Sequence, residues 1–187
     1  MAREALKALS RKDLTVDELF ETLDAMPAMP PQAEALIGYS LLEDVLKSAL
    51  INSFPTRLSN TDITNMFDND GPIASIGARA SLAFALGIIG TNTRADINCV
   101  KDIRNAFAHS RVTLGFDSPE VASACRDLTA PHRLYGKERL WGKDGEPEWP
   151  PTDPRKLFRA TVKLTWLHIT QSSTPLGRAS NPLLTSP

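Results

Sequence analysis

One long run of apolar residues at helical spacing, with prolines on both sides, most constrains how this chain folds. Between Pro31 and Pro55 the apolar side chains recur every three or four positions, at Leu36, Ile37, Leu41, Leu42, Val45, Leu46 and Ala49. This spacing is typical of an α-helix that buries one face. Proline is tolerated at a helix start and disfavoured in a helix interior. The sequence therefore predicts a long amphipathic helix over residues 32–53.

Helix-start signals recur along the rest of the chain, whereas the alternating pattern of a strand does not. Thr15 to Glu18 fits a capping box that opens a helix through Ala25, and Ser59 to Asp62 fits the start of a short helix through Phe67. Further helices are expected over residues 73–89 with Gly90 as the stop, 93–110 with a cap from Thr93 to Asp96, 117–128 and 153–170. These signals predict an all-α fold, a single helical bundle of about six to eight helices.

The length of 187 residues predicts one domain, which we place over residues 1–170. Within it, residues 129–151 are rich in Gly, Pro, Trp and charges and have no clear period, so a protruding surface loop is expected there. Residues 171–187 are rich in Ser, Thr, Pro and Asn and predict a disordered tail.

The charge balance argues against direct DNA binding. The net charge is −1 and the pI is about 6.3, whereas dedicated DNA-binding domains are usually basic. Residues 1–125 carry 11 Lys and Arg against 16 Asp and Glu, and residues 126–163 carry 9 against 6. The basic segment contains Tyr135, Trp141 and Trp149, which either fold the loop back on the core or stack on nucleic-acid bases. RNA therefore stays among the partners to consider.

The sequence predicts a cytoplasmic protein without cofactor or metal. Charges interrupt the N-terminus where a signal peptide needs an apolar run, and the most apolar stretch, residues 80–90, is too short to span a bilayer. Cys99 and Cys125 are expected to be free thiols, with a redox pair as the alternative. The three histidines have no metal-ligand spacing to each other or to the cysteines.

The segment from Asp96 to Ser110 carries the most informative polar pattern. On a helix of about 100° per residue, its apolar side chains form one stripe, and Asp102, Asn105 and His109 form an opposite one. Arg104 lies between the two. Such a polar face is either simply solvated, or it holds a site in which Asp102 orients His109 and Arg104 binds an anion. His109 could also make an ordinary hydrogen bond in a core or interface.

Residues 104–109 resemble the Arg-polar-x-x-x-His signature of the HEPN superfamily, the higher eukaryote and prokaryote nucleotide-binding domains. Residues 34–128 as a whole resemble the mannitol operon repressor family of bacteria. The segments that carry this resemblance are Asp70-Gly71-Pro72, Ser75, Arg79, Leu82 to Ile89, Ile103 to His109 and Phe116 to Val121. It weakens over the last helix and is absent from the tail.

The mannitol repressor resemblance implies an all-helical regulator of transcription, but no mode of DNA binding. The sequence offers no helix-turn-helix pair with a basic recognition helix. We therefore expect a transcriptional regulatory protein that acts through protein–protein contacts, as a homodimer and with an unknown protein partner. A helical interaction domain without a ligand is an alternative from another class.

The HEPN resemblance implies a different function, a metal-independent endoribonuclease or RNA-binding module that works as a dimer. In that alternative His109 is the general acid or base at the ribose 2′-hydroxyl, and Arg104 stabilises charge on the phosphate. Asn105 would position the phosphate or the imidazole. The founding mannitol repressors carry a degraded form of this signature, whereas this sequence keeps all three residues.

Arg79 is a further candidate because it interrupts an otherwise apolar helix. A guanidinium buried there needs an acceptor, and Glu43 or Asp44 on the long helix can provide it. Such a salt bridge would tie two helices together. The alternative is that Arg79 binds an anionic ligand near Arg104.

Overall fold

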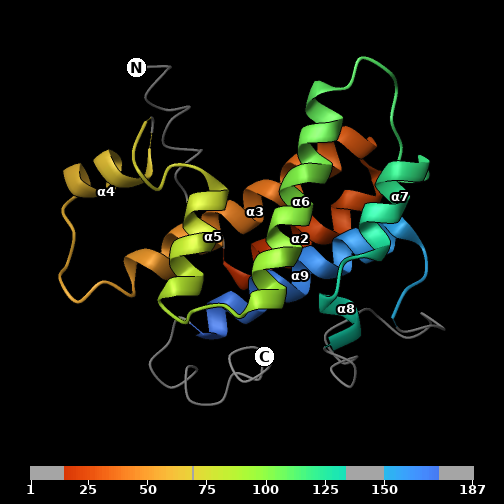
Figure 1. Cartoon of the computed structure of the whole chain (residues 1–187). Helices are drawn as coiled ribbons and strands as arrows, with labels where there is room; N and C mark the ends of the chain where they lie inside the picture. The colour runs from red at the N-terminus through yellow and green to blue at the C-terminus, as the bar shows by residue number, and fades with distance from the viewer. Residues whose placement is uncertain (1–14, 69, 134–149, 173–187) are drawn as a thin grey trace.

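A computed structural model describes residues 15–68, 70–133 and 150–172 of the chain (Figure 1). These residues form helices, turns and loops without a strand, which confirms the predicted all-α fold. Most of the predicted loop over 129–151, with its three aromatic residues, lies outside the described residues. So does the predicted tail, except for residues 171 and 172. Within the described parts of these two segments, residues 130–133 and 171–172 are helical, and residues 129, 150 and 151 are not.

The helices pack around one central member, α3. The elements along the chain are α2 (Val16–Ala25), the 3-10 helix η1 (Met26–Ala28), α3 (Pro31–Ile51), α4 (Asn60–Phe67), α5 (Ile76–Ala85), α6 (Thr91–His109), α7 (Pro119–Arg126), α8 (Ala130–Arg133) and α9 (Pro154–Ser172). Helix α3 packs against α5, α6 and α9, and α5 also packs against α6. Helices α7 and α8 bridge α6 and α9, while α4 projects to one side of the bundle (Figure 1).

Three of the predicted helix starts are confirmed by their side-chain caps. The Thr15 hydroxyl accepts a hydrogen bond from the Glu18 amide, and the Glu18 carboxylate accepts one from the Thr15 amide, which completes a capping box. Ser59 and Asp62 make the same reciprocal pair at α4. At α9 the Asp153 carboxylate accepts from the Lys156 amide at 2.8 Å. These caps depend on neighbours three residues away, so the sequence alone identifies them.

The boundary between α5 and α6 differs from the prediction of a helix over 73–89. Helix α5 begins at Ile76 with Ser75 as its cap, and it ends at Ala85. The chain then turns through Gly87, whose φ of 69° favours glycine. Gly90 is the N-cap residue of α6 rather than the stop of α5. The predicted cap from Thr93 to Asp96 is also wrong, because these residues lie inside α6.

The core is formed by apolar side chains from all the packed helices, and it brings α3 very close to α9. A Cβ atom placed on Gly38 of α3 would lie 2.8 Å from the Phe158 ring of α9. Only glycine therefore allows this approach without a shift of Phe158. The Phe158 ring continues into a row with Phe116 and Phe107, at centroid distances of 5.1 and 5.2 Å. The row joins α9 to α6 through the 110–118 segment.

Candidate functional site

Helix α6 carries the predicted apolar stripe on its buried side. Ile97, Val100, Ile103 and Phe107 are at most 8% exposed. Their burial turns the opposite side of the helix outward, where Asp102 and His109 are exposed and Asn105 is half-buried. The helical projection is thus correct, and a polar face on α6 is present. Arg104 lies at the edge of this face and is half-buried.

Arg104 is held by two contacts, one across to α3 and one to its neighbour. Its guanidinium carbon lies 4.8 Å from the centroid of the Tyr39 ring, at cation–π distance. Its Nη1 donates a 3.0 Å hydrogen bond to Asn105 Oδ1. Its Nε is buried and has no hydrogen-bond partner among the described residues. The chain thus fixes the position of the guanidinium without satisfying all its donors.

Tyr39 joins Arg104 to a second charged pair, Glu43 and Arg79. The Tyr39 hydroxyl donates to Glu43 Oε1 at 3.4 Å, and Arg79 Nη1 lies 3.7 Å from the same oxygen. The pKa of Tyr39 is raised above its ordinary value of 10.0, mainly by burial and to a lesser extent by the Glu43 carboxylate. Arg104 and Arg79 act in the opposite direction. These contacts define the Tyr39–Arg104 cluster, which consists of Tyr39, Glu43, Arg79, Arg104 and Asn105.

Arg79 of α5 is 5% exposed and acts as a clamp that ties α5 to α3, to the end of α4 and to the turn at Ile73. Its Nε, Nη1 and Nη2 donate to the carbonyl oxygens of Ile73, Glu43 and Phe67 at 3.1, 3.1 and 2.7 Å. The expected ion pair with Glu43 is present. Because these bonds engage all three nitrogens of its guanidinium, its position favours a structural role over the alternative of ligand binding.

His109 and Asp102 are not brought together by the fold. Asp102 pairs with Lys101 at 3.4 Å, and seven residues of helix separate it from His109 by about 10 Å along the axis. His109 ends α6, and its side chain makes no hydrogen bond with the other described residues. Arg104 and His109 are five positions apart, so they leave the helix in directions that differ by about 140°. In a single chain Arg104 therefore joins Tyr39 and not His109.

Tyr39 is the member of the cluster that sequence reasoning missed. Its spacing of four residues from Glu43 on the long helix is a signal for an intrahelical hydrogen bond. Its contact with Arg104 depends on how α3 packs against α6. Local periodicity does not contain that information.

Two further buried carboxylates hold the bundle together. Asp96 of α6 accepts from the Thr129 amide at 2.8 Å and from Arg133 Nη2 at 2.9 Å, so it fixes α8. Glu34 of α3 is fully buried and pairs with Arg155 and Arg159 of α9. Burial raises the pKa of Glu34 above its ordinary value, against the opposing effect of Arg155. The contacts of both carboxylates join different helices, so we assign Asp96 and Glu34 a structural role that stabilises the bundle.

The two cysteines are free thiols, Cys125 buried and Cys99 half-buried. Burial raises the pKa of Cys99 to about 11 and that of Cys125 to about 12. The described structure contains no disulfide between them, and its thiols are protonated at neutral pH. No group of histidine, cysteine and carboxylate side chains suited to a metal ion occurs among the described residues.

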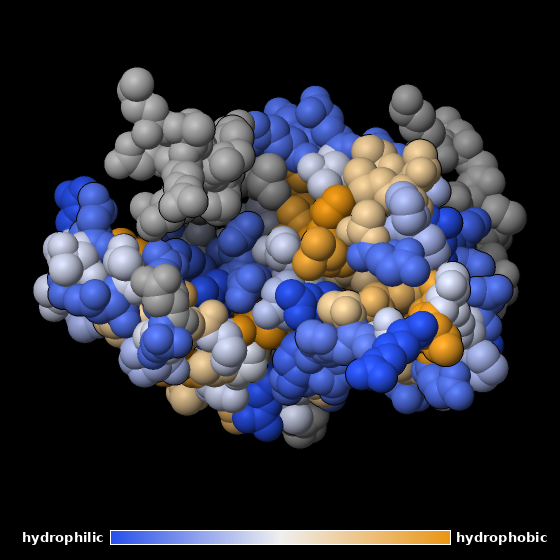
Figure 2. Space-filling model, turned by 90° about the horizontal axis from the view of Figure 1, so that it is seen from above, coloured by the Kyte–Doolittle hydropathy of each residue, from blue (hydrophilic) through white to orange (hydrophobic). Residues whose placement is uncertain are grey.

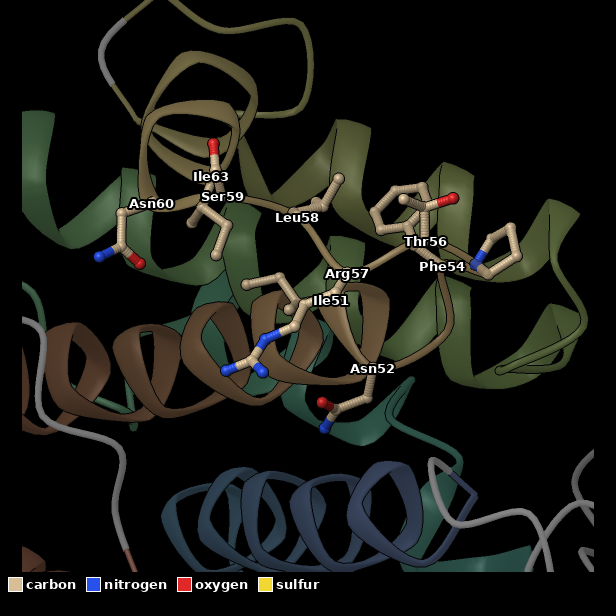
Figure 3. Close-up of a pocket in the computed structure, with 10 residues that line it drawn as sticks. Ile51, Asn52, Phe54, Thr56, Arg57, Leu58, Ser59, Asn60 and Ile63 are labelled. Carbon is tan, nitrogen blue, oxygen red and sulfur yellow. The ribbon is translucent and has the colours of Figure 1, made fainter.

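A hollow of about 650 Å³ lies where α3 ends and α4 begins (Figure 3). Its lining comes from residues 51, 52 and 54–60, together with Ile63. Arg57 is the charged side chain among these residues. None of the candidate site residues on α6 lines it. The hollow is therefore separate from the Tyr39–Arg104 cluster.

These features define a class of protein, an all-helical bundle with a charged cluster on its α3–α6 face. Its fold is shared with a chain of the X-ray structure of the MtlR-HPr complex from Escherichia coli, with a TM-score of 0.55 at 15% sequence identity. The match covers 82% of this chain and 96% of that chain. No protein-family model and no curated protein matches the sequence. No helix in the described part of the chain is long and apolar enough to cross a membrane.

Proposed function

We propose that this protein is a cytoplasmic regulator that acts by binding a protein partner, in the manner of a mannitol operon repressor. The observation that carries the proposal is the shared fold with a chain of the MtlR-HPr complex, over nearly the whole of that chain. The matched protein was solved in a protein–protein complex. A partner related to HPr is therefore the first to test.

The charge distribution supports contact with protein in preference to DNA. Residues 1–125, which contain the α3–α6 face, carry five more acidic than basic residues. A DNA duplex is densely anionic, and proteins bind it through clustered Lys and Arg. Transcriptional regulation by this chain would thus depend on a bound partner or on an assembled homodimer for any DNA contact.

A calorimetric titration with purified HPr tests the proposal. We expect saturable binding with a stoichiometry of one HPr per chain. The His109→Ala variant should bind equally well, because His109 makes no contact that shapes the face and a regulator needs no acid or base there. The absence of heat on titration, together with the absence of a complex in gel filtration, would contradict the proposal.

A second candidate function is a metal-independent endoribonuclease or RNA-binding module, and one observation favours it. His109 is exposed at the end of α6, and Arg104 and Asn105 are joined by a 3.0 Å hydrogen bond on the same helix. A general acid or base must be reachable by the substrate, and His109 is. Because one chain directs Arg104 away from His109, this function requires a homodimer in which two copies of α6 meet.

Incubation of the protein with a mixed RNA pool in the presence of a chelator tests this second function. Cleavage should disappear in Arg104→Ala and in His109→Ala while both variants fold normally. A wild-type protein that leaves the RNA intact at every salt concentration, and that sediments as a monomer, rules out the dimeric nuclease. Unchanged HPr binding in His109→Ala would then favour the regulator.

A further inference from the structure

The Tyr39–Arg104 cluster contains an uncompensated positive charge. Its charged members are one carboxylate, Glu43, and two guanidiniums, Arg79 and Arg104. Glu43 Oε1 is already engaged by Arg79 Nη1 and by the Tyr39 hydroxyl. Arg104 has the neutral Asn105 amide as its hydrogen-bond acceptor. The cluster therefore has room for one more negative charge, next to Arg104.

The guanidinium of Arg104 also has unused donors. A guanidinium carries five N–H groups, and one of its three nitrogens, Nη1, donates to the chain here. Its Nε–H is buried without an acceptor, which is costly for a charged donor. Stacking on Tyr39 covers a face of the guanidinium and leaves its edge for a planar acceptor. A carboxylate that approaches the far end of the guanidinium can pair with its two terminal nitrogens, Nη1 and Nη2.

One exposed apolar side chain lies on α3, and another lies just beyond the end of α6. Leu36 lies one turn before Tyr39 on α3 and is 49% exposed. Val112, just beyond the end of α6, is 70% exposed. Gln32 Nε2 donates to the Leu114 carbonyl at 3.5 Å, so the start of α3 lies beside the 110–116 segment that contains Val112. On the face seen from above, apolar and hydrophilic surface areas lie next to one another (Figure 2).

We propose that this part of the α3–α6 face receives an aspartate or glutamate side chain of a partner protein, with an apolar residue of that partner beside it. Arg104 forms a bidentate pair with the carboxylate, and Leu36 and Val112 contact the apolar residue. Arginine and tyrosine at the centre of a contact, with apolar groups around them, are typical of protein-interaction hot spots. The surplus of acidic residues over 1–125 disfavours a polyanion such as RNA at the same place.

This inference rests on the proposed function, and a peptide titration tests it without knowledge of the natural partner. The probe is a capped helical peptide with leucine and glutamate one turn apart. A matched peptide has glutamine for each glutamate, and a short oligouridylate is the RNA arm. The readout is the Nε–H resonance of Arg104 in the full-length, ¹⁵N-labelled protein, assigned with the Arg104→Gln variant. Arg94→Gln is the control, because Arg94 also lies on α6 and stacks on an aromatic ring, 4.1 Å from the centroid of Phe84.

We expect the acidic peptide to move the Arg104 resonance and to bind at least about tenfold more tightly than the glutamine peptide. Arg104→Gln should abolish this difference, and Arg94→Gln should preserve it. Equal binding of the two peptides, no shift at millimolar acidic peptide, or a shift caused by oligouridylate alone would overturn the inference. If HPr still binds in the calorimeter in that case, the proposed function stands and only the assignment of Arg104 fails.

Discussion

Replacing Arg79 with methionine will measure how much of the stability depends on one buried guanidinium. The substitution keeps the length of the side chain and removes three hydrogen bonds to the carbonyls of Ile73, Glu43 and Phe67. Each buried acceptor left without its charged donor costs about 1–1.5 kcal/mol. The expected loss is therefore about 3–5 kcal/mol in the free energy of unfolding, a large share of the total for a domain of this size.

Urea unfolding followed by circular dichroism provides the assay, with the midpoint and slope both fitted. Arg57→Met is the matched control, because Arg57 is exposed, and it should change the free energy of unfolding by less than about 0.5 kcal/mol. Arg79→Lys should fall between the two, since one ammonium cannot reach three separated carbonyls. A loss below about 1 kcal/mol for Arg79→Met would refute the clamp.

Two further predictions concern the core. Gly38→Ala places a methyl group 2.8 Å from Phe158 and should destabilise the protein by about 1–3 kcal/mol in the same urea assay. Gly77→Ala is the control, because no atom lies within 4 Å of the added Cβ, and it should stabilise the protein by about 0.5–1 kcal/mol. A gain in stability for Gly38→Ala would contradict the close packing of α3 on α9. Because burial raises the pKa of Cys125 to about 12 from 9.0, the contribution of this thiol to stability should be constant below pH 9 and fall as the pH rises from 9 towards 12, where the unfolded thiol ionises first. The free energy of unfolding of Cys125→Ala should fall less over that pH range than that of the wild type. Identical pH profiles for the two proteins would refute the raised pKa of a buried thiol.

The sequence predicts the helices well where their limits depend on near neighbours. The capping pairs at Thr15 and Ser59 need only residues three positions away, and both are confirmed. The limits of α5 are predicted less well, because Ile73 and Ile89 continue the apolar pattern but lie in buried turns outside the helix. Burial produces that pattern with or without a helix, so hydrophobicity alone cannot locate the ends.

The candidate site shows the same division between local and tertiary information. The polar stripe of α6 follows from helical geometry, and its outward position is confirmed. That Arg104 meets Tyr39, and that Asp96 holds Thr129 and Arg133 instead of capping a helix, depends on contacts between residues 33 to 65 positions apart. A single sequence provides no record of such pairs.

We propose that this protein works through a protein partner bound on its α3–α6 face. The most direct measurement is the set of amide chemical-shift changes in the ¹⁵N-labelled protein on titration with purified HPr. We expect changes concentrated at residues 32–43 of α3, 101–109 of α6 and the adjoining 110–114 segment. Changes confined to the hollow at residues 51–63, or no change at saturating HPr, would contradict it.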